Sequence, residues 1–340
     1  MRYLSEENTV ENNNNNIKVD LKDRKILYLL GINARIPINF IAKKVGLSKD
    51  SISYRIKRLE KAGIIKGTRA LINASFFGYT PYHLFIRLKN PIKSAENEIV
   101  SQLKKLPCAR AILKFYGAYD LQVAIIARSI EEFDKISQKI ISIVKEYLEE
   151  YEILIISKYM KVGSFHNGFY EAEKVSLAKD YVKKDIKIDS KDMDLLRLLS
   201  EDARISLLEL SSKLKTSPDT VAYRIKKLEN KVITGYVPVI SFGNLGYNMS
   251  AILLTIHNLD ETKEELIKHF CKSYPTVLWG VKTVGKYNIM IYVCTKNQEE
   301  LQETITHIRG LYPGDLKECQ SLLGVADYLY TYAPEILFKT

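Results

Sequence analysis

The chain has 340 residues, with 51 lysines and arginines against 40 aspartates and glutamates, so its formal net charge is +11. This surplus favours an anionic partner such as nucleic acid, although a soluble lysine-rich surface would produce the same balance. No apolar run approaches the roughly 18 residues of a membrane span, and the cysteines are scattered, without a Cys-x-x-Cys pair or a nearby histidine. The composition therefore excludes a transmembrane protein and suggests neither a disulfide framework nor a zinc site, and we expect a cytoplasmic protein that uses no metal or cofactor.

The first part of the chain predicts a helix-turn-helix unit behind a disordered leader at residues 1–19. Apolar residues at helical spacing follow Asp20, a short helix is expected over 39–44, and Ser48 is placed to cap a third helix that ends near Ala62. In this third helix, apolar residues recur at i, i+4 and i+7, which is the buried stripe of an amphipathic helix. Helix, short helix, turn and helix in this order are typical of a helix-turn-helix.

After the helical unit the pattern changes to short strands and helices. A β-rich segment over 64–73 is followed by the order strand, helix, strand, strand, helix, strand, which is that of a ferredoxin-like sandwich. These elements are expected over residues 82–89, 95–106, 109–115, 121–127, 130–148 and 151–161.

The second half of the chain repeats the first. At an offset of 169, residues 20–60 and 189–229 are identical at 18 of 41 positions. The third helix of this copy opens with Ser217-Pro218-Asp219, which is an N-cap, a proline at the first helical position and an acid at the positive helix end. A β-rich segment and the ferredoxin-like elements are again expected, over residues 232–241, 249–257, 263–272, 276–283, 289–293, 298–308 and 316–323. A period this long indicates a duplicated module, not a solenoid repeat.

The sequence thus predicts an α+β protein in which two winged helix-turn-helix domains alternate with two ferredoxin-like (βαββαβ) domains. The expected boundaries are 1–19 for the leader, 20–73 and 74–162 for the first pair of domains, 163–187 for a linker, and 188–241 and 242–340 for the second pair.

The third helix of each helix-turn-helix unit carries a basic face opposite its apolar stripe. Residues 48–69 hold seven basic and two acidic residues, a net +5, and residues 215–235 hold five and two, a net +3. Cations suit phosphates, while hydroxyls and a tyrosine ring suit base edges in the DNA major groove. The residues expected to contact DNA are Lys49, Ser51, Ser53, Tyr54, Lys57, Arg58, Lys61, Thr220, Tyr223, Lys226 and Lys227. The alternative is a solvated helix face in a winged-helix fold that serves only oligomerisation.

Two further arginines lie beside the apolar stripe instead of opposite it. These are Arg55 and Arg224, and their position favours structural ion pairs with a carboxylate such as Asp23 or Asp192 over base recognition.

The sequence resembles the Lrp/AsnC family, the feast-famine transcription regulators. The motifs that carry the resemblance are Asp20-x-x-Asp23, Asn33-Ala-Arg35-Ile, Gly46-Leu-Ser48, Tyr54-Arg-Ile-Lys-Arg-Leu-Glu60, Ala62-Gly-Ile-Ile-Lys-Gly67, Gly78-Tyr79 and Gly117-Ala-Tyr-Asp120. It covers residues 20–160 and 188–330 and implies that a winged helix-turn-helix binds double-stranded DNA and that a ferredoxin-like (RAM) domain dimerises through its sheet. Family members usually carry one such unit per chain, so two units imply an intrachain pseudo-dimer and leave further self-association open.

The resemblance also implies an effector, often an amino acid, bound at the Gly-x-Tyr-Asp motif. Backbone NH groups beside the turn glycine would bind a ligand carboxylate, and the aspartate would face its amine; alternatively, the glycine only supplies a positive φ and the tyrosine only packs. The second copy has asparagine at the aspartate position, so its site is in more doubt. The residues concerned are Gly117, Tyr119 and Asp120 in the first copy and Gly285, Tyr287 and Asn288 in the second.

The leading functional hypothesis is a DNA-binding transcriptional regulator. Because the two recognition helices differ at several outward positions, an asymmetric operator is expected. The rival hypothesis is an enzyme like the siroheme decarboxylases, which resemble this chain in architecture. Such an enzyme would need basic and histidine residues gathered in the sheet cavity. The histidines here are dispersed along the sequence, so no catalytic residue is expected. A third hypothesis is a ligand-sensing scaffold that no longer binds DNA.

Overall fold

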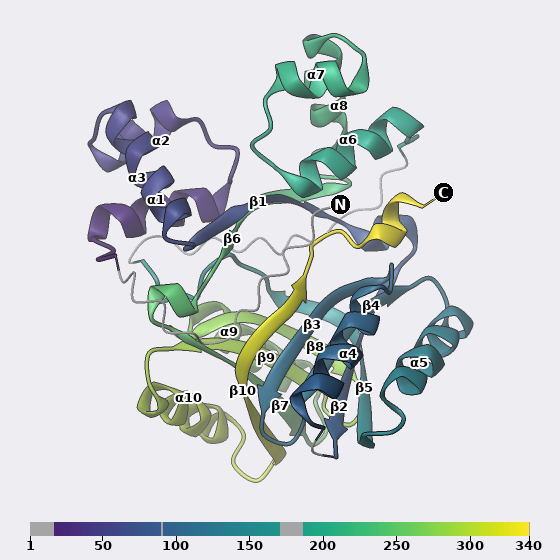
Figure 1. Ribbon diagram of the computed structural model, residues 1–340. Helices are drawn as coiled ribbons and strands as arrows, with labels where there is room; N and C mark the ends of the chain where they lie inside the picture. Colours follow the sequence, from purple (N-terminus) through teal and green to yellow (C-terminus); the bar gives the residue numbers. More distant parts are fainter. Residues whose placement is uncertain (1–16, 90, 171–185, 340) are drawn as a thin grey trace.

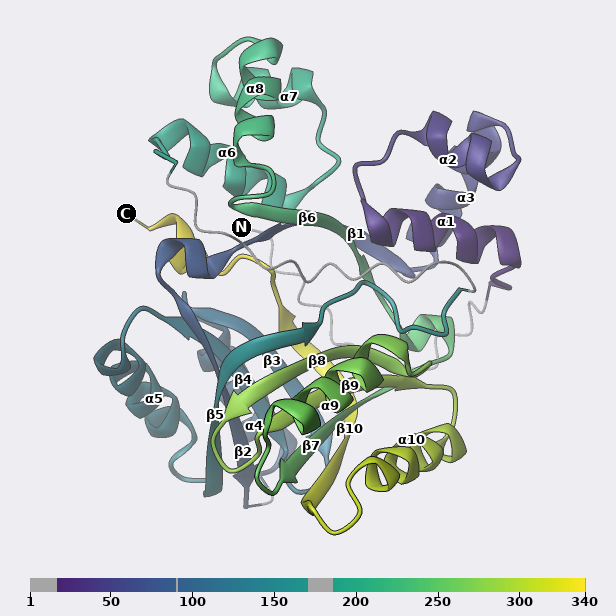
Figure 2. The same ribbon diagram turned by 180° about the vertical axis from the view of Figure 1, so that it is seen from behind.

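Two helix-turn-helix units stand side by side on a β-ribbon, and the ribbon lies above a closed β-barrel (Figure 1, Figure 2). The structure is a computed structural model that describes residues 17–89, 91–170 and 186–339. The leader expected at 1–19 and the linker expected at 163–187 therefore fall partly outside the described residues. Within the described part of the chain, no helix is both long and apolar enough to cross a membrane.

The first helix-turn-helix unit consists of α1 (Leu21–Ile32), α2 (Ile38–Val45) and α3 (Lys49–Lys61). Caps supplied by the local sequence start α1 and α3 and end α2. Asp20 and Asp23 form a capping box at the start of α1. Gly46 ends α2 in the left-handed conformation with φ 72°, and the Ser48 hydroxyl accepts a hydrogen bond from the backbone NH of Ser51 at 3.2 Å. The turn between α2 and α3 is therefore determined locally.

The second unit consists of α6 (Ser190–Glu201), α7 (Leu207–Leu214) and α8 (Pro218–Leu228). Asp189 and Asp192 repeat the capping box, and Ser217 caps α8 ahead of the proline. The turn differs, because Lys215 takes the left-handed conformation with φ 48° where the first unit has glycine. A side chain with a Cβ is disfavoured in this region by roughly 1 kcal/mol or more.

A two-stranded antiparallel ribbon joins the two units. It pairs β1 (Ile65–Ile72) with β6 (Ile233–Ile240), so that Ile65 lies opposite Ile240 and Ile72 lies opposite Ile233. Ile65 packs in the core of the first unit, whereas Ile72, at the other end of the same strand, packs in the core of the second. Each half of the chain therefore supplies one strand to a ribbon that both units share.

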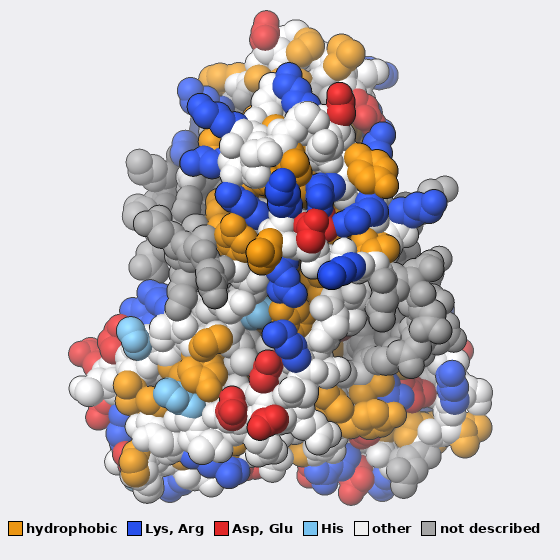
Figure 3. Space-filling model, turned by 90° about the vertical axis from the view of Figure 1, so that its left-hand side faces the viewer, with side chains coloured by type: hydrophobic (Ala, Val, Ile, Leu, Met, Phe, Trp, Pro, Cys, Tyr) orange, Lys and Arg blue, Asp and Glu red, His pale blue; other side chains and the backbone are white. Residues whose placement is uncertain are grey.

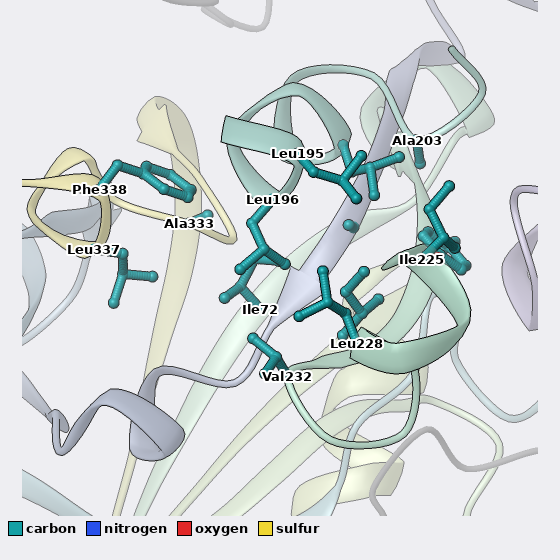
Figure 4. Packing of buried hydrophobic residues seen from close by; sticks show 14 of the residues in the cluster. Ile72, Leu195, Leu196, Ala203, Ile225, Leu228, Val232, Ala333, Leu337 and Phe338 are labelled. Carbon is teal, nitrogen blue, oxygen red and sulfur yellow. The ribbon is translucent and has the colours of Figure 1, made fainter. Parts of the chain in front are cut away.

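Figure 4 shows the core of the second unit, in which Leu196 of α6 and Leu228 of α8 lie around Ile72 of β1. The same core includes Leu337 and Phe338 from the C-terminal segment. The core of the first unit likewise includes aromatic residues from outside it: Phe165, Phe169 and Tyr247. Both helical units are thus packed against segments that lie elsewhere in the sequence.

The other named strands form the barrel: β2 (Thr80–Leu88), β3 (Ala109–Tyr116), β4 (Leu121–Ala127), β5 (Leu148–Lys161), β7 (Asn248–Ile256), β8 (Val277–Val284), β9 (Ile289–Thr295) and β10 (Leu316–Tyr330). Their order is β10-β3-β4-β2-β5-β8-β9-β7, and β7 pairs back onto β10. Each half contributes a four-stranded sheet with ferredoxin-like order. The two sheets meet at two seams, β5 with β8 and β10 with β3.

Helices cover the outside of the barrel: α4 (Lys93–Lys104), α5 (Ile130–Val144), α9 (Glu261–Ser273) and α10 (Gln298–Leu311). One apolar core lies between each pair of helices and its sheet, and a further core fills the inside of the barrel. Short 3-10 helices that the sequence did not predict occur at η1 (Ala74–Phe77), η2 (Gly243–Leu245) and η3 (Glu335–Phe338).

Two strands are longer than expected, and both cross from one half of the barrel to the other. The helix expected over 130–148 ends at Val144, and β5 already begins at Leu148; the strand expected over 316–323 continues to Tyr330. The first part of β10 pairs with β7 and its second part with β3 of the other half. In the same way β5 pairs with β2 and then with β8. The additional residues of β10 pair with β3 of the other half, whereas the additional residues of β5, 148–150, pair with β2 of the same half. The expected boundaries were wrong at both places.

Candidate nucleic-acid interface

The outward faces of α3 and α8 present cations around a tyrosine. Tyr54 is 68% exposed and Tyr223 is 70% exposed, so both rings stand in solvent on the side opposite the core. Lys57 and Lys61 are exposed on α3, and Lys226 is exposed on α8. These positions are three to four residues apart and therefore share one helix face. The structure thus brings these expected DNA-contacting residues together in each unit.

The small polar residues at the start of the helices are hydrogen-bonded locally. The Ser51 hydroxyl bonds to the N-cap serine hydroxyl at 2.9 Å, and the Thr220 hydroxyl does the same in the second unit at 2.8 Å. The Ser53 hydroxyl donates to the carbonyl oxygen of Lys49 at 2.9 Å. Each hydroxyl oxygen still has acceptor capacity. Their contact with DNA stays a prediction.

A fully buried carboxylate, Asp23, anchors α3 to α1. Arg55 donates to Asp23 at 2.7 Å and to Asp20 at 2.8 Å, and Arg58 also donates to Asp23. The structural role expected for Arg55 is confirmed. Arg58, which the sequence predicts to contact DNA, has a side chain that is 33% exposed, and one of its nitrogens donates to the same carboxylate.

The second unit repeats this arrangement around Asp192, which is also fully buried. Arg224 donates to Asp192 at 2.6 Å and to Asp189 at 2.8 Å, which confirms its expected structural role. Lys227 takes the place of the second arginine and donates to Asp192 at 2.6 Å. The hydrogen bonds from Arg224 lower the pKa of the Asp189 carboxyl below its ordinary value. Lys227, like Arg58, therefore faces a buried carboxylate as well as the solvent.

The basic residues form a broad positive surface. Figure 3 shows the side of the molecule that the first helix-turn-helix unit occupies, and lysine and arginine side chains gather over its upper half. Acidic side chains are sparser there. Clustered cations around an exposed helix are the electrostatic pattern of a nucleic-acid interface.

The glycines of the two Gly-x-Tyr-Asp/Asn motifs lie at the seams of the barrel. Gly117 has φ 139°, and a Cβ there would lie 3.0 Å from Leu322 and 3.1 Å from the carbonyl oxygen of Ser321, both on β10. Gly285 has φ 148°, and a Cβ there would overlap the carbonyl oxygen of Ile153 on β5. Both glycines therefore permit a close approach between strands of different halves.

The motif side chains are occupied by contacts within the protein. Asp120 accepts a hydrogen bond from the backbone NH of Leu88 at 2.8 Å. Asn288 accepts from the backbone NH of Ile256 at 3.0 Å and donates to its carbonyl oxygen at 2.7 Å. The rings of Tyr119 and Tyr287 are buried in the barrel core; burial raises the pKa of Tyr287 to about 12. These contacts supply the packing role considered for the motif, and effector binding there stays a prediction.

One polar cluster was missed by sequence reasoning. His83 of β2, Gln122 of β4 and Tyr292 of β9 form a buried hydrogen-bonded chain, and the His83 ring lies parallel to that of Trp279 on β8, with 6.2 Å between centroids. Burial lowers the pKa of His83 to about 3, so its imidazole is neutral at physiological pH. The only sequence signal was a polar residue at an inward strand position, because the four residues lie on strands from both halves.

Comparison with known proteins places this architecture among winged helix-turn-helix proteins. A model of winged helix-turn-helix DNA-binding domains matches residues 19–66, and one of AsnC-type helix-turn-helix domains matches residues 188–229. The regulator LrpA of Pyrococcus horikoshii is 32% identical over 139 residues, which is 40% of this chain and 96% of LrpA. The regulatory protein AsnC of Haemophilus influenzae is 30% identical over 119 residues, which is 35% of this chain and 79% of AsnC.

The chain belongs to the Lrp/AsnC family. Each of these relatives corresponds to less than half of it, in agreement with the duplication in its sequence. The siroheme decarboxylase NirDL is similar over nearly the whole length, covering 94% of this chain and 97% of NirDL with a TM-score of 0.60. The sequence identity is 14%, so this similarity is one of fold.

Proposed function

We propose that the chain is a sequence-specific, double-stranded DNA-binding transcriptional regulator that acts as an intrachain pseudo-dimer. The observation that carries the proposal is the pair of recognition helices on one shared ribbon, each with an exposed tyrosine beside at least one exposed lysine. The family membership supports it, because LrpA is named as a transcriptional regulator and AsnC as a regulatory protein. The cytoplasm, where such a protein would meet DNA, is the proposed location.

The chemistry of the helix faces fits the two tasks of a DNA contact. Lysine ammonium groups would neutralise phosphates and release counterions, which gives affinity without sequence preference. Tyrosine and serine side chains on the same face would contact base edges or sugars. Because the first helix presents Ser53 where the second presents Ala222, we propose that the two halves of the operator differ in sequence.

The test is a binding assay with duplexes that the protein selects from a random DNA pool. At about 50 mM salt the wild type should bind, and its affinity should fall steeply as salt rises. Replacing Lys57 and Lys61 with alanine should weaken binding at least about tenfold and lower the slope of log K against log salt by about 2. The matched control is Lys135→Ala with Lys139→Ala, which removes two exposed cations at the same spacing from α5 and should leave binding unchanged.

Absence of DNA binding by the wild type at about 50 mM salt would overturn the proposal and leave the ligand-sensing scaffold in its place. Equal losses of DNA affinity in the two double-lysine variants would show an effect of net charge alone. In that case α3 would not be the contact surface.

A second candidate is an enzyme that acts on a tetrapyrrole, and the His83 cluster inside the barrel is the observation that favours it. Trp279 offers a ring face, and Arg110, whose charge contributes to the lowered pKa of His83, offers a cation for a carboxylate. The low pKa of His83 argues against this residue as a proton donor near neutral pH. A saturable change in siroheme absorbance on titration with the protein, lost in Trp279→Ala, together with turnover of siroheme by the wild type, would favour the enzyme. A titration without any absorbance change would rule this candidate out.

An amino-acid or other small-metabolite effector at the seam glycines also remains a proposal. Gly117 and Gly285 are exposed to solvent, so a ligand carboxylate could reach the backbone beside them. Equilibrium dialysis against the common amino acids, with Asp120→Ala as the variant, tests it. Binding that Asp120→Ala leaves unchanged would place the effector elsewhere.

A further inference from the structure

In each helix-turn-helix unit, an arginine in the loop between the first and second helices binds the backbone of the corresponding loop in the other unit. Arg35 donates to the carbonyl oxygens of Ala203 and, at 3.4 Å, Ile205 in the second unit. Arg204 donates to the carbonyl oxygens of Ala34 at 2.7 Å and of Ile36 at 3.4 Å in the first unit. The two arginines are 169 residues apart, the offset of the duplication, so the contact is reciprocal.

Each of these loops is also fixed to a strand of the other half. The backbone NH of Ala34 donates to the carbonyl oxygen of Tyr236 on β6 at 2.8 Å, and that of Ala203 donates to Thr68 on β1 at 3.1 Å. The backbone NH of Arg35 donates to the side-chain oxygen of Asn33 at 2.8 Å, and this hydrogen bond forms a local turn in the loop. The Arg204 loop has the same turn, made by Asp202. The guanidinium groups therefore join two loops that are each already hydrogen-bonded to a strand.

The loops lead directly into the helix-turn-helix motif. α2 begins two residues after Ile36, and α2 and α3 are joined by a tight turn that locks their angle. A displacement of the loop would therefore carry the recognition helix with it. Since a guanidinium has several donors in a fixed plane, it restricts direction as well as distance between the carbonyls it binds.

The contact brings two cations together, which is unfavourable in itself. Burial lowers the pKa of Arg204, and the charge of Arg35 acts in the same direction. The carboxylates of Asp202 and Glu60 partly compensate. A contact with this electrostatic penalty at Arg204 is better explained by a gain in geometry than by stability alone.

We propose that Arg35 and Arg204 are positioning residues that fix the separation and relative twist of α3 and α8. This inference rests on the proposed DNA-binding function and adds a specificity to it: the protein selects operators by the spacing of their two halves. Two helices held rigidly would contact major grooves on one face of the duplex, about 34–36 Å apart if they are one helical turn apart.

The experiment compares wild type with Arg35→Ala/Arg204→Ala on a selected duplex and on duplexes with about 5 or about 10 base pairs inserted between the halves, half a turn and one turn. For the wild type, the half-turn insertion should weaken binding on the order of 10²-fold, because both helices no longer engage together. In the double variant the same insertion should weaken binding less than about tenfold, with affinity for a single half-site unchanged. An unchanged penalty for the insertion would overturn the inference.

A matched control is Arg24→Ala/Arg197→Ala. These arginines also donate to backbone carbonyls, Arg24 to Phe169 at 3.5 Å and Arg197 to Phe338 at 3.4 Å, but not between the two units. This control should keep the wild-type spacing profile. If the alanine double variant does not fold, as judged by circular dichroism, Arg35→Lys/Arg204→Lys is measured instead, since an ammonium lacks the planar fork.

A second measurement needs no DNA. Spin labels on cysteines placed at the exposed, equivalent positions Lys44 and Lys213, with Cys319→Ser, report the distance between the units. The distance distribution should be narrow in wild type and broader in the alanine double variant. If the wild type binds no DNA, the proposed function fails. The distance distribution still tests whether Arg35 and Arg204 fix the two units relative to each other, and an unchanged width in the double variant would overturn that inference.

Discussion

The two helix-turn-helix units share their internal contacts and differ on their outward faces. Both have a capping-box aspartate that is fully buried, with two cations on it, and both turn from the second to the third helix through a left-handed residue. The outward residues and the residue in that turn differ, glycine in one unit and lysine in the other. Contacts required for folding are therefore kept in both copies, and the faces available to a partner are free to diverge.

The two halves of the barrel differ in a comparable way. His83 and Gln122 of the first half meet Trp279 and Tyr292 of the second. At the offset of 168 that relates Gly117 to Gly285, the positions equivalent to His83 and Gln122 hold Ala251 and Met290. The inside of the barrel is thus polar and aromatic near one seam and aliphatic at the equivalent place.

The largest expected effect concerns the buried carboxylates. Asp23→Ala should lower the free energy of unfolding by about 3–5 kcal/mol, because it leaves Arg55 and Arg58 without their buried partner. Asp192→Ala should have a similar effect, which chemical denaturation can measure. A loss below about 1 kcal/mol in only one variant would show that the two units do not depend equally on this contact.

The seam glycines should differ in their sensitivity. Gly285→Ala should destabilise the protein by about 3 kcal/mol, since the new methyl group would overlap the backbone of β5, and Gly117→Ala by about 1–2 kcal/mol, since Leu322 can move. Guanidinium denaturation of the two variants measures the difference. Equal losses would mean that the positive φ alone, and not the seam contact, requires glycine.

Acid should destabilise the protein through His83, which has no histidine at the equivalent position in the other half of the barrel. Because the folded-state pKa of His83 is depressed to about 3, the folded protein binds fewer protons than the unfolded chain, and the stabilisation present above pH 6.5 is lost as the pH falls toward 3. Between about pH 6 and pH 4 the free energy of unfolding should fall about 1.4 kcal/mol per pH unit more steeply in wild type than in His83→Gln. Denaturation at several pH values measures this. Parallel curves would show that His83 is accessible to protons in the folded state.

The smallest effect concerns the turns. Lys215→Gly should stabilise the second unit by about 0.5 kcal/mol, because glycine removes the left-handed penalty but adds entropy to the unfolded chain. Gly46→Lys should destabilise the first unit by a similar amount. Thermal melting of both variants checks the sign, and a destabilising Lys215→Gly would show that the lysine side chain contributes to the fold.

Much of the helical architecture could be predicted from the sequence, because it depends on neighbours in the chain. The caps at Asp20, Ser48 and Ser217, and the apolar stripes behind them, are local signals, and each helix begins where they indicate. The ion pairs of Arg55 and Arg224 could also be expected, because both lie beside the stripe of a helix whose partner helix starts with an acid.

Contacts between the halves could not be predicted in this way. The pairing of β5 with β8 and of β10 with β3, the contact of His83 with Trp279, and the reciprocal hydrogen bonds of Arg35 and Arg204 all join residues more than 100 positions apart. A strand pattern states that a residue faces inward but not which residue of another strand it meets.

The sequence by itself therefore determined the duplicated module, its order of helices and strands, and the basic faces of α3 and α8, since these follow from periodicity, capping and composition. The tertiary structure decided how the copies combine: into one ribbon, one barrel and one reciprocal arginine contact. The physical reason is that hydrogen bonds between β-strands and between a guanidinium and a backbone carbonyl depend on position in space, and side-chain identity alone does not specify the partner.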